Sequence, residues 1–93
     1  MTVGVLRLEF MIPDARTLKD KRRVVKSIKD RLAHLFNISI AEVDALDKCQ
    51  RAVLGVAMVA NEGHFIHSCL DKIVDWVRHQ RRVTLLDVSR ELF

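Results

Sequence analysis

Hydrophobic and polar residues alternate along the start of the chain, from Thr2 to Ile12. Alternation of this kind is typical of a β-strand with one face in the core. Arg7 and Glu9 fall on one side of this strand, so the opposite side is expected to face the core. The core-facing set is Gly4, Leu6, Leu8, Phe10 and Ile12. Pro13 then ends the strand and opens a loop.

The period changes to that of a helix after this loop. Thr17 to Asp20 has the pattern of a capping box, with Asp in place of the usual Glu, and a helix is predicted from there to about Phe36. Its apolar residues share one arc of about 120° on a helical wheel. They are Val24, Val25, Ile28, Leu32, Leu35 and Phe36. Asn37 is expected to take the left-handed conformation that ends many helices.

Two strands are predicted next. Ile38 to Leu46 alternates again, Asp47-Lys48 is expected to form a hairpin turn, and Gln50 to Ala60 is apolar enough for the middle of a sheet. In the first of these strands, Glu42 and Asp44 fall on one side, and Ala41 and Val43 fall on the other. Gly55, inside the second, predicts a bulge or a close backbone approach.

A second helix is predicted from about Glu62 to His79, with Asn61 as its N-cap, and Arg82 to Leu92 forms the last strand. The apolar residues of this helix share an arc of about 140°. They are Phe65, Ile66, Cys69, Leu70, Ile73, Trp76 and Val77.

The predicted order is therefore β-α-β-β-α-β. Two amphipathic helices on one face of a four-stranded antiparallel sheet make a ferredoxin-like α+β fold. The handedness of crossover connections places the third strand between the first and the second. The 93 residues are expected to form a single domain, residues 1–93, and this common fold does not by itself specify a function.

Composition indicates the cellular compartment of the protein. The longest unbroken apolar run, Ala52 to Ala60, is nine residues, whereas a transmembrane helix needs about twenty, so no membrane partner is expected. The first eleven residues lack the pattern of a signal peptide. Cys49 and Cys69 are too few for a disulfide scaffold. These features predict a cytoplasmic protein.

The charge is concentrated in one segment. The chain has 16 Lys and Arg against 12 Asp and Glu, a formal charge of +4. Arg16 to Arg31 alone holds eight basic and two acidic residues, which is +6 and leaves −2 for the rest. Five of its basic residues fan across the helix face opposite the apolar arc, namely Lys19, Arg22, Arg23, Lys26 and Lys29. Lys21 falls inside that arc and is expected to snorkel or to turn toward the loop. A second basic cluster, residues 78 to 82, follows the second helix.

This stripe is interpreted as a surface for phosphate backbones, in RNA or DNA. The candidate nucleic-acid-binding residues are Arg16, Lys19, Lys21, Arg22, Arg23, Lys26, Lys29, Arg81 and Arg82. The predicted third strand has no aromatic residue on which bases could stack, so contact through backbone and shape is expected. A solvated helix face and an acidic protein partner remain alternative interpretations.

Candidate catalytic and metal-binding groups are sparse. No nucleophile–base pair or carboxylate pair stands out, so no catalytic residue and no cofactor is predicted. His64, His67 and Asp71 share one helix face at a spacing that could hold a metal ion, but such spacing arises easily by chance and no metal is predicted. A small enzyme that uses the first loop as an anion site is a third, more distant alternative.

The sheet face away from the helices is expected to be partly apolar. Its expected members are Val3, Val5, Met11, Ile38 and Ile40, with Arg7, Glu9, Glu42 and Asp44 among them. Such a face is often covered by a second copy or another protein, although an antiparallel sheet can also leave one face in water. A homodimeric interaction module with no nucleic-acid role is therefore the alternative function.

Four stretches resemble the YlxP-like family of bacterial proteins. They are residues 3–9 (VGVLRLE), 18–24 (LKDKRRV), 41–44 (AEVD) and 50–57 (QRAVLGVA). The resemblance implies a ferredoxin-like fold. Genes of this family tend to lie beside genes for translation initiation and ribosome maturation, which implies RNA or the small ribosomal subunit as the partner. We therefore expect a non-enzymatic accessory protein of ribosome maturation or translation that contacts structured RNA or ribonucleoprotein through the basic helix face.

Overall fold

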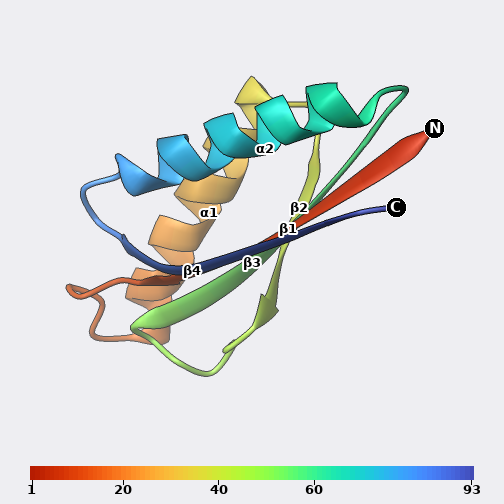
Figure 1. Ribbon diagram of the computed structural model, residues 1–93. Coiled ribbons are helices and arrows are strands. Elements are labelled where there is room, and N and C mark those ends of the chain that lie inside the picture. The colour runs from red at the N-terminus through yellow and green to blue at the C-terminus, as the bar shows by residue number, and fades with distance from the viewer.

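A computed structural model describes residues 1–93 and contains the predicted six elements in the predicted order (Figure 1). Their bounds are β1 Thr2–Met11, α1 Leu18–Leu35, β2 Ser39–Asp44, β3 Arg51–Ala60, α2 Gly63–Arg78 and β4 Thr84–Leu92. The sheet order is β2-β3-β1-β4, and every neighbouring pair is antiparallel. The ferredoxin-like α+β arrangement is confirmed, including the position of β3 between β1 and β2.

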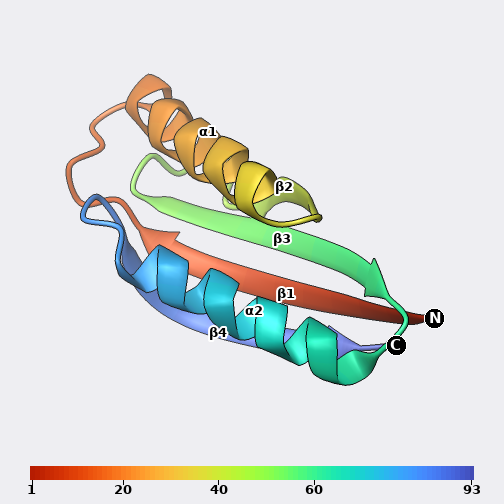
Figure 2. The same ribbon diagram turned by 90° about the horizontal axis from the view of Figure 1, so that it is seen from above.

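Both helices cover the same face of the sheet (Figure 2). The predicted inner side of β1 is confirmed, since Leu6, Leu8 and Phe10 are fully buried. Leu35 and Phe65, in terminal turns of their helices, were expected in the core but are more than half exposed. Neither helix is both long and apolar enough to cross a lipid bilayer.

Two glycines permit close packing. A Cβ atom at Gly4 would overlap the Cγ2 methyl of the buried Ile66, so α2 can lie directly on β1 only where this strand has no side chain. A Cβ at Gly55 would lie 3.0 Å from Cγ1 of Val43. The close neighbour of Gly55 is therefore a side chain, whereas the sequence predicted a bulge or a close backbone approach.

The predicted faces of β2 are wrong because of a bulge. Glu42 lies opposite Leu54 and Asp44 lies opposite Val53, so the register shifts at Val43. Leu54 is fully buried beneath the helices and Val53 is the next residue along β3, so the bulge puts Glu42 and Asp44 on opposite faces of the sheet. Ile38 and Ile40 pack against the core rather than on the open face.

The start of α1 follows its sequence signal. The Thr17 hydroxyl accepts the Asp20 N–H at 3.1 Å, and the Asp20 carboxylate accepts the Arg16 N–H at 3.0 Å. The helices end near Phe36 and His79 as predicted, but the two other predicted capping residues, Asn61 and Asn37, are wrong. The N-cap of α2 is Glu62, whose side chain makes no capping hydrogen bond. The only non-glycine residue with positive φ is Ala45, at 54°, so Asn37 is not left-handed.

Candidate nucleic-acid interface

The exposed basic residues of α1 divide into two flanks. The flank toward β2 carries Arg22, Lys26 and Lys29 around a shallow hollow, and Asp30 and Glu42 line the same hollow. The Lys26 ammonium lies 2.6 Å from an Asp30 carboxylate oxygen. Asp30 therefore offsets part of the positive charge on this side of the helix, and Glu42 is paired with Lys21.

The other flank joins the two basic clusters of the sequence. Here α1 and the turn between α2 and β4 enclose a hollow of about 310 Å³. We call it the basic hollow, and its polar walls are Arg23, Ser27 and Arg31 from α1 with His79, Gln80, Arg81 and Arg82 from the turn. Its floor is Val24, Ile28 and Val83, which are buried. No carboxylate lines it.

The arginines of the basic hollow have no ion-pair partner. Arg7, Arg51 and Arg90 each lie within ion-pair distance of a carboxylate, whereas Arg23, Arg31, Arg81 and Arg82 do not. Asp20 is close enough to Arg23 to feel its charge, but that carboxylate bonds to the Arg16 N–H instead. The positive charge of this flank is therefore available to an external anion.

Arg31 is held in place by α2. Its guanidinium lies 5.5 Å from the centroid of the Trp76 ring, a cation–π distance, and Nη1 makes a long 3.5 Å contact to the Gln80 side chain. Gln80 in turn donates to the Trp76 carbonyl at 3.0 Å. The sequence-based list of site residues omitted Arg31. Its i+8 spacing from Arg23 was a usable signal, because residues four apart form one row along a helix.

Lys21 is the one candidate that the structure places away from solvent. Its side chain is 1% exposed, and Nζ donates to the carbonyls of Ala45 at 2.7 Å and Arg51 at 3.1 Å. Nζ also lies 2.7 Å from Oε2 of Glu42, which has no other polar partner. Lys21 is therefore removed from the candidate interface, because its ammonium is occupied by groups of the fold.

Arg16 and Lys19 are exposed at the start of α1. The pKa of the Asp20 carboxyl is held below its usual 3.8. The main cause is the hydrogen bond from the Arg16 N–H, and the Thr17 backbone, the Thr17 hydroxyl and the charge of Arg23 contribute less. An internal carboxylate therefore already interacts with the amides at this helix end, which leaves the side chains as the groups that face a partner.

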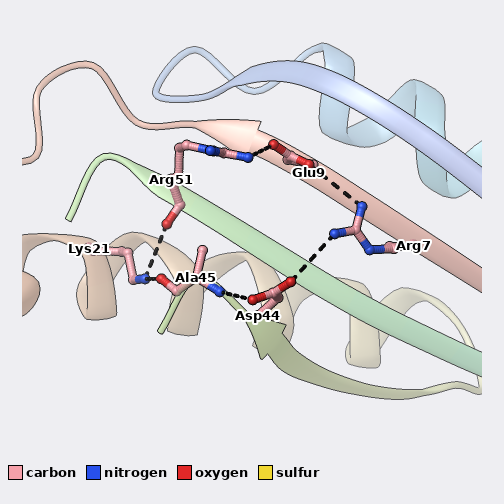
Figure 3. A network of polar contacts seen from close by, with 6 residues as sticks. All are labelled: Arg7, Glu9, Lys21, Asp44, Ala45 and Arg51. Carbon is pink, nitrogen blue, oxygen red and sulfur yellow. Dashed lines mark hydrogen bonds and ion pairs between the residues drawn. The ribbon is translucent and has the colours of Figure 1, made fainter. Parts of the chain in front are cut away.

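A second hollow, of about 410 Å³, lies on the open sheet face at the β2–β3 turn. Its charges form a connected network (Figure 3). Arg7 lies 3.6 Å from Glu9 and 3.8 Å from Asp44, and Arg51 pairs with Glu9. This network was not predictable from the sequence, because strand pairing brings its residues together. Its positive and negative side chains compensate one another, whereas no carboxylate compensates the arginines of the basic hollow.

The remaining chemical candidates do not form a cluster. Asp71 pairs with Arg90 at 2.8 Å, and no group of three or more His, Cys, Asp or Glu side chains is placed to hold a metal ion. Cys49 and Cys69 are both unpaired and partly buried.

Together, the fold and the interface define a small ferredoxin-like domain with a basic face on its helical layer. Residues 3–90 match the family described as "Protein of unknown function (DUF503)", and the chain belongs to that family. The "Uncharacterized protein YlxP" of Bacillus subtilis (strain 168) is 41% identical over 59 residues. That alignment covers 63% of this chain and 64% of the relative, so the chain matches just under two thirds of the relative's length. The resemblance to YlxP-like proteins is confirmed.

Proposed function

We propose that this protein is a non-enzymatic accessory factor that binds structured RNA or ribonucleoprotein through the helical layer. The observation that carries the proposal is the basic hollow, where α1 and the α2–β4 turn present four arginines without a paired carboxylate. The proposed contact residues are Arg16, Lys19, Arg22, Arg23, Lys26, Lys29, Arg31, Arg81 and Arg82.

Phosphate is the chemistry that suits this surface. Guanidinium groups present several N–H donors in a plane that matches phosphate oxygens, and neutralising phosphates releases condensed counterions. The open sheet face offers less, because its arginines are already paired and β3 carries no aromatic side chain for base stacking. Contact with the backbone of a folded RNA therefore fits better than readout of bases.

The place of this activity in ribosome maturation or translation is part of the proposal, and it rests on the resemblance to YlxP-like proteins. The direct test is binding of small-subunit ribosomal RNA to the wild-type chain and to a variant with Arg23, Arg81 and Arg82 all changed to Glu. Strong loss of binding in the variant supports the proposal. Equal binding by both proteins contradicts it.

The second candidate function is a homodimer through the open sheet face. Val3 lies opposite Val59 and Val5 lies opposite Ala57 on this face, and Val59 is 58% exposed. Light scattering at rising concentration tests it. A mass that doubles in the wild type and stays monomeric in Val59→Glu supports the dimer, and a monomer at all concentrations contradicts it.

A further inference from the structure

We propose that the basic hollow, besides contacting the RNA backbone, binds a terminal phosphate, the polyanionic end of a phosphorylated ligand, more tightly than an internal phosphodiester. The inference deepens the proposed function and rests on it, because the hollow is part of the same RNA-binding surface. It assigns contact with a backbone alone to the flank toward β2, and contact with both a backbone and a terminal phosphate to the basic hollow.

The density of charge argues for a terminal group. An internal phosphodiester carries one negative charge, and the phosphates of a strand are spaced along it, which suits a stripe of separated lysines and arginines. A terminal phosphate carries about −1.5 to −2 at neutral pH and has three strong acceptor oxygens. Four arginines that pair with no carboxylate line one hollow, and together they carry more charge and more donors than one phosphodiester can use.

The shape of the site supports the same conclusion. The floor of the hollow is apolar and buried at Val24, Ile28 and Val83, which limits solvent on that side. Arg31 is positioned in advance by Trp76 and Gln80, so less side-chain entropy is lost when an anion binds. The volume of about 310 Å³ lies at the lower end of the range of small-molecule sites, which suits a phosphorylated chain end.

Two sources could provide such a group, the 5′ end of an RNA strand and a free nucleotide. The experiment therefore compares one RNA sequence prepared with a 5′-triphosphate, a 5′-monophosphate or a 5′-hydroxyl, together with a nucleoside triphosphate alone. All affinities are measured at one ionic strength near physiological. We expect the 5′-triphosphate RNA to bind at least about tenfold more tightly than the 5′-hydroxyl RNA, since charge-assisted hydrogen bonds are the strong ones.

Substitutions of arginine by glutamine test whether the preference for a phosphorylated end arises at the basic hollow. Arg23→Gln with Arg82→Gln is expected to abolish the preference for the phosphorylated end, and Arg81→Gln provides a second, independent variant. Arg78→Gln is the matched control, because Arg78 is also exposed and unpaired but does not line the hollow. Thermal unfolding of each variant verifies that these surface changes leave the fold intact.

The outcomes separate this inference from the proposed function. If all three RNAs bind equally tightly, or if Arg78→Gln reduces the preference as much as the other variants, the inference is overturned while RNA binding stands. If no RNA binds but the nucleoside triphosphate binds and the hollow variants weaken it, the inference stands, with a nucleotide as the ligand, and the RNA-binding proposal fails. If no phosphorylated ligand binds, both fail.

Discussion

The ammonium group of Lys21 lies 2.7 Å from Oε2 of Glu42, beneath the helical layer. The same ammonium donates to the carbonyls of Ala45 and Arg51, so one side chain of α1 joins the end of β2, the following turn and the start of β3. A basic residue inside residues 18–24, one of the stretches that resemble YlxP-like proteins, therefore serves the fold rather than an external partner.

Replacing Lys21 with Met is expected to destabilise the protein by about 3 to 5 kcal/mol, the usual cost of removing one partner of a buried ion pair. The loss arises because Glu42 and two backbone carbonyls would remain without their donor. Urea unfolding followed by circular dichroism measures it. A change below about 1 kcal/mol would show that the ion pair does not hold α1 to the turn.

Lys26 provides the matched control for that measurement. It also pairs with a carboxylate, that of Asp30, but both side chains are well exposed, at 75% and 63%. Lys26→Met is therefore expected to change the free energy of unfolding by no more than about 0.5 kcal/mol, as for other exposed i,i+4 pairs. If Lys26→Met and Lys21→Met destabilise equally, burial is not the cause of the difference.

The contact between Gly4 and Ile66 predicts non-additive mutations. Gly4→Ala is expected to destabilise by about 1 to 3 kcal/mol, because the new methyl group overlaps a buried side chain. Ile66→Ala removes the overlapping methyl, so the double variant should lose less stability than the two single changes together predict. Denaturant unfolding of all four proteins gives the coupling energy, and strict additivity would refute the direct contact.

Asp20 predicts a dependence on pH. Because the pKa of its carboxyl is lower in the folded chain than the usual 3.8, the charged form stabilises the fold above that pH. This stabilisation is lost as the pH falls through the folded-state pKa. The melting temperature of the wild type should exceed that of Asp20→Asn near pH 6, and the gap should close in strong acid. A gap that stays constant down to about pH 2 would contradict the assignment.

Local patterns were sufficient to predict the elements and their order. Alternation identified the inner face of β1, and the Thr17–Asp20 pattern located the start of α1. The β2 faces were mispredicted because a single bulged residue, Val43, reverses the alternation, and its position depends on pairing with β3.

The sequence was sufficient to predict the two basic segments that form the candidate site, residues 16–31 and 78–82. Their union at the basic hollow was not predictable, since it depends on how α1 packs beside the α2–β4 turn. Lys21 was included among the binding residues because a helical wheel shows the direction of a side chain but not its acceptors. Those acceptors, Glu42, Ala45 and Arg51, lie more than twenty residues further along the chain.

We propose above that the helical layer binds RNA through phosphate contacts at the basic hollow. The most direct measurement is the affinity for small-subunit ribosomal RNA across a range of salt concentrations. It compares the wild type, the variant with Arg23, Arg81 and Arg82 changed to Glu, and a control of equal net charge with Lys48, Lys72 and Arg78 changed to Glu.

Log affinity of the wild type should fall linearly with log salt, with a slope of about −0.7 to −0.9 for each phosphate contacted. The hollow variant should bind weakly with a flatter slope, and the control should retain most of the wild-type slope. Binding that does not depend on salt, or an equal loss in the control and the hollow variant, would contradict phosphate binding at the basic hollow.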